Sequence, residues 1–364
     1  MLTLVLAGGL ALAAPASDAE RGPQAKPFEI ITLADGVYGF VWKDPLEDLI
    51  EGNSLIVVNE SDVLVVDTGN FPSTARRMVA EIERLTGEPV RYVVNTHWHD
   101  DHHSGNAVFR ERWPGVEFIA HEDTRTDIRE RSYGGRLEDL AGIEGQIATL
   151  ERWIADGVDD AGKPMDERRK QRARAIIGAN RWALDELRDV EEQPPDLVFR
   201  DRLVLQRGTR TIELLWLGRG NTRGDVVVLL PEERIVATGD LLVYPVPFAF
   251  YSYYEDWIGT LAALDGLPAD VLFLAHGRPQ RDRAYLRQVR GLLLTLVDGA
   301  RAAAAEGLDL EQVRARLTLP EWRARFAGDD EARGRAFDSF FLAPGVERAF
   351  RQATGDPSAS SPTR

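Results

Sequence analysis

The sequence predicts a mixed α/β protein in which two β-rich stretches are separated by a helical one. Short apolar runs with strand character fill residues 28–120 and return between residues 203 and 274. Residues 122–195 and 281–354 are instead rich in charge and follow a helical pattern. A chain of 364 residues, 44% hydrophobic and 28% charged, is long enough for a large core and has a globular composition. Periodicity alone predicts no finer architecture.

In the first β-rich stretch, a polar turn at residues 59–62 joins the runs Leu55–Val58 and Val63–Val66, which predicts a hairpin. Ser73 is expected to cap a helix that runs to about Leu85. The remaining elements expected here are a buried strand at Val90–Val94, a helix near Gly105–Arg112 and a strand at Val116–Ala120.

In the second β-rich stretch, strands are expected at Leu203–Gln206, Thr211–Leu217, Asp225–Leu230, Arg234–Ala237 and Val271–Leu274. Residues 122–195, with a helical pattern over Met165–Val190, are interpreted as an insertion between the two halves. Its helices either pack on the edge of the fold or form a lid over a pocket. We expect residues 281–355 to form a C-terminal helical region and residues 356–364 a disordered tail.

Residues 1–16 are apolar and small, too short for a membrane span, and end like a secretory signal, although no Lys or Arg precedes them. They predict a signal peptide, a disordered lead-in at residues 17–27, and a periplasmic or secreted protein without stable membrane association after cleavage. The absence of cysteine excludes disulfides and thiolate metal ligands. A net charge of −15 argues against nucleic acid as a partner, so a small-molecule substrate is expected. Oligomeric state is not predicted.

Residues 97–102, with the sequence His-Trp-His-Asp-Asp-His, concentrate the chemistry of the chain. Four of its six histidines lie between positions 97 and 103. Because the segment follows the buried run Val90–Val94, it is expected in a loop at the end of a strand. Neutral imidazole and carboxylate suit zinc and its first-row neighbours, so the segment predicts a metal site.

The pattern His-x-His-x-Asp-His resembles the signature of the metallo-β-lactamase superfamily. Four further blocks extend the resemblance in family order over roughly residues 30–280: Val63–Gly69, Gly218–Asp225, Thr238-Gly239-Asp240 and Ala275-His276-Gly277. The resemblance implies a four-layer αβ/βα sandwich over residues 28–280, with residues 122–195 inserted into it.

The resemblance also implies a ligand set for two metal ions. It assigns His97 and His99 to the first metal, Asp101, His102 and His276 to the second, and Asp240 to a bridge between them. Zinc is expected, one or two ions per chain, although iron or manganese suits the same donors. A carboxylate bridge supports metals about 3.5–4 Å apart, and Asp101 is expected to assist proton transfer.

Asn221 departs from the family pattern, which usually places the third histidine of the first metal at this position. An amide oxygen is seldom chosen by zinc, so Asn221 is expected to be at most a weak ligand. Three outcomes remain open: a two-metal site with a labile first ion, an enzyme that uses the second site alone, or a non-catalytic relic. His103 is expected to begin a helix and face away from the ligands, and His121 to end a strand as a non-ligand.

Asp67 ends the strand at Val63–Val66, close to the predicted ligands. It is interpreted as an acceptor that orients a ligand histidine, with a turn carboxylate as the alternative. Residues 244–254 are unusually aromatic and follow Asp240 closely. They form either core or the wall of a substrate pocket, and the pocket residues expected are Tyr244, Phe248, Phe250 and Tyr251. Flanking arginines (Arg219, Arg223 and Arg278) either hold a substrate carboxylate or lie on the surface.

The sequence therefore predicts a zinc-dependent hydrolase. A metal-bound hydroxide is expected to attack the carbonyl of a small cyclic amide or ester, with the β-lactam or lactone class favoured. The alternative is a metal- or ligand-binding module whose catalysis is impaired by Asn221. A third hypothesis is an oxygen-activating iron enzyme, which iron in the purified protein would support.

Overall fold

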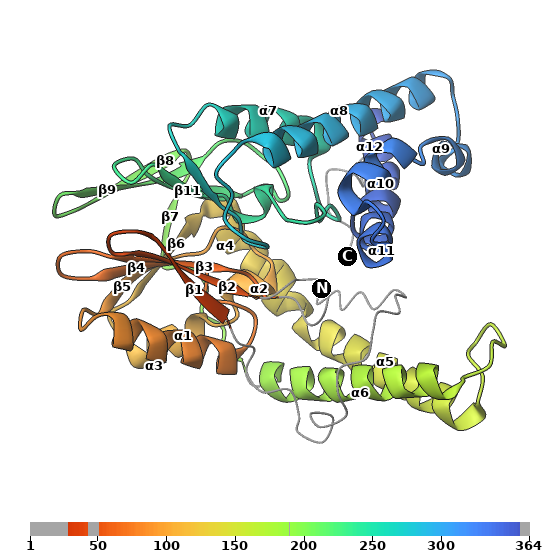
Figure 1. Ribbon diagram of the computed structural model, residues 1–364, viewed down its shortest axis with the longest axis horizontal. Helices are drawn as coiled ribbons and strands as arrows, with labels where there is room; N and C mark the ends of the chain where they lie inside the picture. The colour runs from red at the N-terminus through yellow and green to blue at the C-terminus, as the bar shows by residue number, and fades with distance from the viewer. Residues whose placement is uncertain (1–27, 43–50, 189, 357–364) are drawn as a thin grey trace.

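The computed structural model describes residues 28–42, 51–188 and 190–356 (Figure 1). The expected signal peptide at residues 1–16, the lead-in at 17–27 and residues 357–364 of the expected tail lie outside the described residues. No helix within the described residues is both long enough and apolar enough to cross a membrane.

The first sheet has seven strands in chain order, and it carries the hairpin expected at residues 55–66. Val58 pairs with Val63 across the polar turn, which confirms that prediction. Pairing is antiparallel up to β4 and parallel from β4 to β7. The strands are β1 (Phe28–Ala34), β2 (Val37–Trp42), β3 (Ser54–Val58), β4 (Val63–Val66), β5 (Val90–Val94), β6 (Glu117–His121) and β7 (Leu197–Phe199). The three-residue β7, which follows two prolines, was not predicted.

The second sheet has five strands in the order β12-β11-β10-β9-β8. They are β8 (Arg202–Arg207), β9 (Arg210–Trp216), β10 (Val226–Leu230), β11 (Ile235–Ala237) and β12 (Val271–Phe273). All five lie within a residue or two of the strands expected from the sequence. β11 and β12 are parallel, so Asp240 and His276, which follow them, emerge at the same edge of the sheet.

The two sheets stack face to face, and helices cover their outer faces. Alternate residues of β3 and β4, such as Val57 and Leu64, pack between the sheets against Phe273, while Ile56 and Val65 pack on the helix side. Figure 1 shows α1 (Pro72–Leu85) and α3 (Asn106–Arg112) on the first sheet, and α7 (Tyr254–Asp265) and α8 (Ala284–Ala305) on the second. The four-layer αβ/βα sandwich is confirmed, although α7 was not predicted.

Helices also occupy the two regions where the sequence expects them. Residues 122–195 form α4 (Glu122–Asp127), a π-helical turn (Ile128–Tyr133), α5 (Gly134–Asp156) and α6 (Glu167–Leu187). Helices α5 and α6 pair around an apolar cluster of their own and project from the sandwich (Figure 1). The C-terminal region adds α9 (Leu310–Arg316), α10 (Pro320–Ala327), α11 (Glu331–Ala336) and α12 (Ala343–Ala353) beside α8.

The start of α1 differs from the prediction. Phe71, not Ser73, is the N-cap, and Pro72 is the first helical residue. Proline suits this position because its ring fixes a helical φ and its missing N–H would have no partner inside the helix. Ser73 lies within the first turn, where its backbone N–H donates to Glu186 Oε2 of α6 at 2.8 Å.

Gly39 of β2 marks the closest approach of the two sheets. A Cβ atom there would lie 2.4 Å from the ring of Phe273 on β12. We expect Gly39→Ala to lower the free energy of unfolding by about 1–3 kcal/mol, because the ring is buried and has little room to move. Urea unfolding of Gly39→Ala and of Gly142→Ala measures this. Gly142 has no atom within 4 Å of the added methyl group and is the matched control. Equal stability of the two variants would contradict close packing at Gly39.

Candidate metal centre

The loop after β5 brings its polar residues to the edge of the sandwich. The chain leaves the sheet at Val94, and His97 and His99 follow in an irregular segment that leads into the short helix α2 (Asp100–His103). His99 has extended backbone angles at the N-cap of α2, so Asp101 and His102 turn back over the loop. The backbone N–H of Gly52 donates to the carbonyl oxygen of Asp101 at 3.3 Å and fixes the turn.

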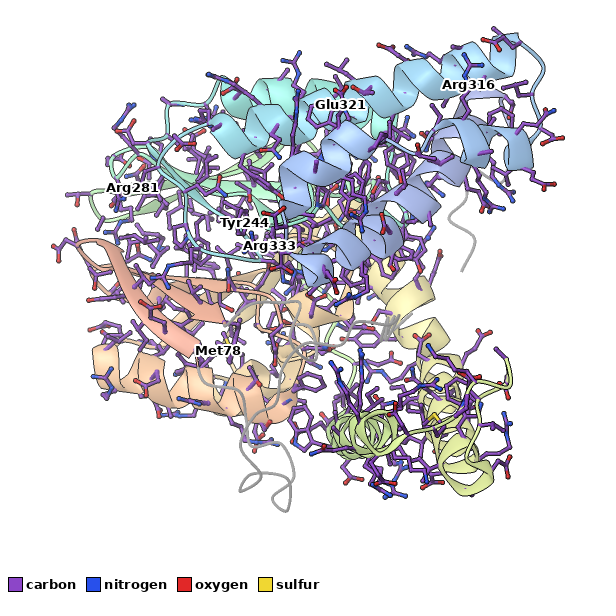
Figure 2. The ribbon with its side chains drawn as sticks, turned by 45° about the vertical axis from the view of Figure 1, so that its right-hand side comes forward. Met78, Tyr244, Arg281, Arg316, Glu321 and Arg333 are labelled. Carbon is purple, nitrogen blue, oxygen red and sulfur yellow. The ribbon has the colours of Figure 1, made fainter. Side chains whose placement is uncertain are left out.

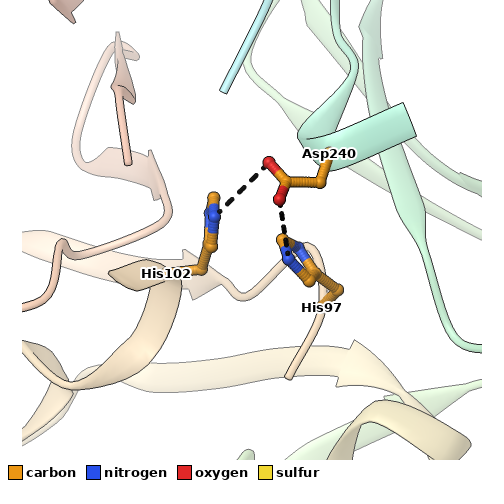
Figure 3. Close-up of side chains that lie close together, drawn as sticks. All are labelled: His97, His102 and Asp240. Atoms are coloured by element: carbon orange, nitrogen blue, oxygen red, sulfur yellow. Dashed lines mark ion pairs between the residues drawn. The ribbon is translucent and has the colours of Figure 1, made fainter. Parts of the chain in front are cut away.

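Asp240 lies between two groups of imidazoles and presents one oxygen to each (Figure 3). Its Oδ2 lies 3.4 Å from His97 Nε2 and 3.8 Å from His99 Nδ1. The other oxygen, Oδ1, lies 3.5 Å from His102 Nε2 and 3.4 Å from His276 Nε2. A carboxylate with its two oxygens directed at separate groups of donors has the arrangement of a bridging ligand.

Each group of donors is compact. On the Oδ2 side, His97 Nε2 and His99 Nδ1 are 2.8 Å apart. On the Oδ1 side, Asp101 Oδ2 lies 3.2 Å from His102 Nε2 and 3.1 Å from His276 Nε2. The structure thus brings together all six residues that the sequence analysis named as ligands.

Burial and mutual charge set the protonation of this cluster. Burial lowers the pKa of His102, but Asp101 and two further carboxylates raise that pKa well above its usual range. Burial also opposes the charge of His276, yet Asp240 and Asp101 raise its pKa to about 9. Burial and the charge of His102 lower the pKa of His97 to about 3. Burial favours neutral carboxyl groups, but the histidines hold the pKa values of Asp101 and Asp240 well below the usual range.

The donor set fits a pair of divalent cations. Asp101 Oδ2, His102 Nε2 and Asp240 Oδ1 are buried, face one another and make no hydrogen bond within the described part of the chain. Buried polar atoms normally have a partner, so three such atoms around one point are placed to hold an ion. Imidazole nitrogen and carboxylate oxygen are ligands of zinc, and the site contains no sulfur donor.

We expect zinc affinity at the second site to depend on pH, because protons compete for the same nitrogens. His276, with a pKa of about 9, and His102 carry protons at neutral pH, and zinc must displace them. Affinity should therefore rise with pH up to about 9, by roughly tenfold per unit for each proton released. Zinc titration in chelator buffers at several pH values measures the slope. An affinity that does not change with pH would contradict these protonation states.

Asp67 accepts three hydrogen bonds at the foot of the site. Its oxygens lie 2.8 Å from the backbone nitrogen of Thr96, from Thr96 Oγ1 and from His102 Nδ1. Asp67 adopts a left-handed backbone conformation (φ 62°), which Asp tolerates better than most residues. Burial raises the pKa of Asp67, and His102 offsets part of that effect. The carboxylate is placed to fix the ring of His102 with Nε2 turned toward the donor cluster.

Asn53 has a similar effect on His276 and was not identified from the sequence. Its Nδ2 donates to the carbonyl oxygens of Leu274 at 2.9 Å and Gly277 at 2.7 Å, on either side of His276. Asn53 therefore ties the last ligand loop to the first sheet. No sequence motif marks it, since it lies 221 residues from Leu274.

At Asn221, the amide faces both Asp240 and Ser252. The Nδ2 atom lies 3.3 Å from Asp240 Oδ2, and the Oδ1 atom lies 3.1 Å from Ser252 Oγ. All three side chains are buried. In this orientation the amide presents its nitrogen, not its oxygen, to the Oδ2 side of the cluster.

The aromatic side chains predicted to line a pocket lie in two places, one beside His99 and the other beside helix α8. The ring centroids of Phe248 and Tyr251 lie 5.6 and 5.9 Å from that of His99, and Phe250 packs on Phe248 at 4.7 Å. Trp98, which the sequence analysis did not single out, joins this wall 5.3 Å from Tyr251.

Tyr244 turns away from the wall. It packs on Tyr285 of α8 at 5.2 Å and lies beside Arg333 of α11 (Figure 2). Its backbone nitrogen donates to the carbonyl oxygen of His276 at 3.2 Å, and its side chain packs against Gly277. Its side chain lies among the C-terminal helices.

The three flanking arginines are engaged in ion pairs: Arg219 with Asp256, Arg223 with Asp127, and Arg278 with Glu29. Arg219 and Arg278 are surface residues, while Arg223 makes two hydrogen bonds of 2.8 Å to buried Asp127. All three guanidinium groups are thus already paired with a carboxylate of the chain.

The remaining histidines lie outside the donor cluster. His103 ends α2, whereas the sequence predicted that it would begin a helix, and its Nε2 lies 3.1 Å from the carbonyl oxygen of Trp98. It therefore faces away from the ligand atoms, as predicted. His121 ends β6, as expected, and stacks on Trp216 at 5.3 Å.

Comparisons with known proteins identify the family of the chain. The family model of the metallo-beta-lactamase superfamily matches residues 48–276. A linear primary-alkylsulfatase from Pseudomonas sp. (strain ATCC 19151) is 22% identical over 273 residues, 71% of this chain, and the chain spans about half (48%) of that relative's length. Among solved structures, a metallo-beta-lactamase from Pontibacter korlensis is 20% identical with a TM-score of 0.52, covering 73% of this chain and 99% of its own. The DIM-1 metallo-beta-lactamase is 17% identical with a TM-score of 0.50, and the match covers 76% of this chain and 99% of the DIM-1 chain. The chain belongs to the metallo-beta-lactamase superfamily.

Proposed function

We propose that the protein is a zinc-dependent hydrolase that acts on a small cyclic amide or ester of the β-lactam or lactone class. The observation that carries the proposal is the position of Asp240, whose two oxygens face separate groups of imidazoles. When bound, a zinc pair supplies Lewis acidity and an activated water for attack on a carbonyl. Water adds to the carbonyl carbon, and the ring C–N or C–O bond breaks.

The predicted ligand residues would hold different ions. His97 and His99 would hold the first ion, and Asp101, His102 and His276 the second, with Asp240 shared between them. Asp101 is also the candidate for proton transfer to the leaving group, through the carboxylate oxygen that does not hold the ion. The wall that contains Trp98, Phe248, Phe250 and Tyr251 would bind an apolar part of the substrate.

The second candidate substrate is a sulfate ester of a primary alcohol. It is favoured by the similarity to the alkylsulfatase, and the aromatic wall beside His99 suits an alkyl chain as well as a ring. Hydrolysis would release inorganic sulfate and the alcohol.

One assay separates the candidates. Zinc-loaded protein is incubated with a chromogenic cephalosporin, a long-chain acyl lactone and dodecyl sulfate, and Asp240→Asn is the control. We expect turnover of the cephalosporin or the lactone that is lost in the variant. Turnover of dodecyl sulfate alone would replace the cyclic substrate with the sulfate ester. Bound zinc without turnover of any probe would favour a binding module. A protein purified with iron and an orange colour would direct the search to oxygen chemistry.

We also propose export to the periplasm or the medium, with residues 1–16 as signal peptide. The apolar composition and small-residue ending of that segment support this proposal. N-terminal sequencing of protein recovered from the periplasm tests it, with cleavage after Ala14 or Ala16 expected.

A further inference from the structure

Asn221 occupies the position at which the family pattern places a third histidine. The side chains around it fix the orientation of its amide group. We propose that Asn221 is not a ligand of the first metal. Its amide N–H group donates to Asp240, and Ser252, held by helix α12, keeps the amide in that orientation. The inference rests on the proposed pair of metals, and it concerns the position of one amide within it.

The orientation follows from the chemistry of the two partners. A carboxylate only accepts hydrogen bonds, so the amide group 3.3 Å from Asp240 Oδ2 must be the nitrogen. The amide oxygen of Asn221 then faces Ser252 Oγ at 3.1 Å and accepts the hydroxyl proton. In this arrangement the amide nitrogen of Asn221 and the hydroxyl of Ser252 each donate to an acceptor.

Reversing the amide would leave the Ser252 hydroxyl without an acceptor. Ser252 is fully buried, and Asn221 Oδ1 is the one hydrogen-bond partner of its hydroxyl within the described ranges. After a flip, Asn221 would offer Ser252 a donor, so the hydroxyl proton would be buried and unpaired, which is costly. Asp240 would lose a donor as well. In return the first metal would gain an amide oxygen, which zinc seldom selects.

Helix α12 fixes the position of Ser252. The carbonyl oxygen of Ser252 accepts hydrogen bonds from Arg348 Nε at 2.8 Å and Gln352 Nε2 at 3.0 Å. Arg348 is only 7% exposed. The next residue, Tyr253, donates its backbone N–H to the carbonyl oxygen of Gly220 at 2.8 Å, next to Asn221. The C-terminal helices therefore hold the segment that orients the amide.

The two metal positions consequently differ in protein donors. The first has three, from His97, His99 and Asp240, and its carboxylate oxygen also accepts the amide proton of Asn221. The second has four, because the other oxygen of Asp240 joins Asp101, His102 and His276. We therefore expect the first ion to bind more weakly than the second.

Zinc affinities of four proteins test the inference: wild type, Asn221→Ala, Ser252→Ala and the double variant, each titrated against a chelator. In Asn221→Ala, first-site affinity is expected to fall by no more than about 100-fold, because Asp240 loses a hydrogen-bond donor but the metal loses no ligand. A loss of more than about 100-fold would show that the amide ligates, and would overturn the inference. In Ser252→Ala, the freed amide can turn its oxygen to the metal, so affinity should rise at least threefold, and this gain should vanish in the double variant. A smaller rise, no change or a loss in Ser252→Ala would overturn the role of Ser252.

Ser104→Ala is the matched control, because it removes a buried hydroxyl near the ligands that has no hydrogen-bond partner in the described residues. If Asn221→Ala does not fold, a crystal structure of the zinc-loaded wild type decides. Asn221 Oδ1 within about 2.2 Å of the first ion would overturn the inference, and a longer distance with Nδ2 on Asp240 would support it. Failure of the inference leaves second-site affinity and turnover intact, whereas a wild type without zinc would mean that the proposed function itself is wrong.

Discussion

Asp240→Asn is expected to lose both metals. The amide has nearly the shape of the carboxylate, but it lacks the charge and has only one oxygen, so it cannot serve two groups of imidazoles at once. Loss of a partner outside the ligand set typically costs 10–100-fold in metal affinity, so loss of the bridge should cost more than about 100-fold at each site. Metals per chain, measured by elemental mass spectrometry after dialysis at limiting zinc, should fall to near zero.

The control for this experiment is His103→Ala. His103 directly follows His102, but its ring contacts the Trp98 carbonyl oxygen and not the donor cluster. Metal content should be unchanged in this variant. Normal metal content in Asp240→Asn, or loss of metal in His103→Ala, would mean that the donor set is wrong. Circular dichroism spectra of both variants show whether any loss of metal is caused by misfolding.

Asp67→Asn is expected to weaken the second site by about 10–100-fold, the usual cost of losing the partner that orients a ligand histidine. Asn tolerates the left-handed backbone at this position, so the fold should be kept. The neutral amide supports His102 Nδ1–H less well than the carboxylate, so Nε2 becomes a poorer and less well oriented ligand. Zinc titration against a chelator measures the change.

Thr96→Val is the companion variant for Asp67. It removes the hydroxyl that donates to Asp67 Oδ2 and leaves the bond to His102 in place. Its effect on second-site affinity should be clearly smaller than that of Asp67→Asn. Equal affinity in Asp67→Asn and wild type would show that the carboxylate merely completes the turn after β4.

The sequence predicted those parts of the site that lie next to each other in the chain or at strand ends. His97 to His102 follow β5 directly, and Asp240 and His276 follow the parallel strands β11 and β12, so each set emerges at the ends of the strands of its own sheet. The family resemblance supplied the prediction that the two sets meet. The polar turn between the apolar runs of β3 and β4 likewise predicted their hairpin.

The features that the sequence did not predict depend on distant contacts. Asn53 and Ser252 are ordinary polar residues until the fold places them beside His276 and Asn221, and no local pattern marks either one. Tyr244 was expected in a pocket because of its neighbours, but α8 offers its ring a partner in Tyr285. At Ser73, the fixed φ of the preceding proline decided the helix start.

The measurement that tests the account most directly is the number of metal ions per chain in wild-type protein purified without chelators and dialysed against limiting zinc. A bridging Asp240 predicts two ions per chain, the first released more readily than the second as a chelator is added. One ion per chain that persists when zinc is raised to saturation, or none, would contradict the bridge on which the proposed function depends.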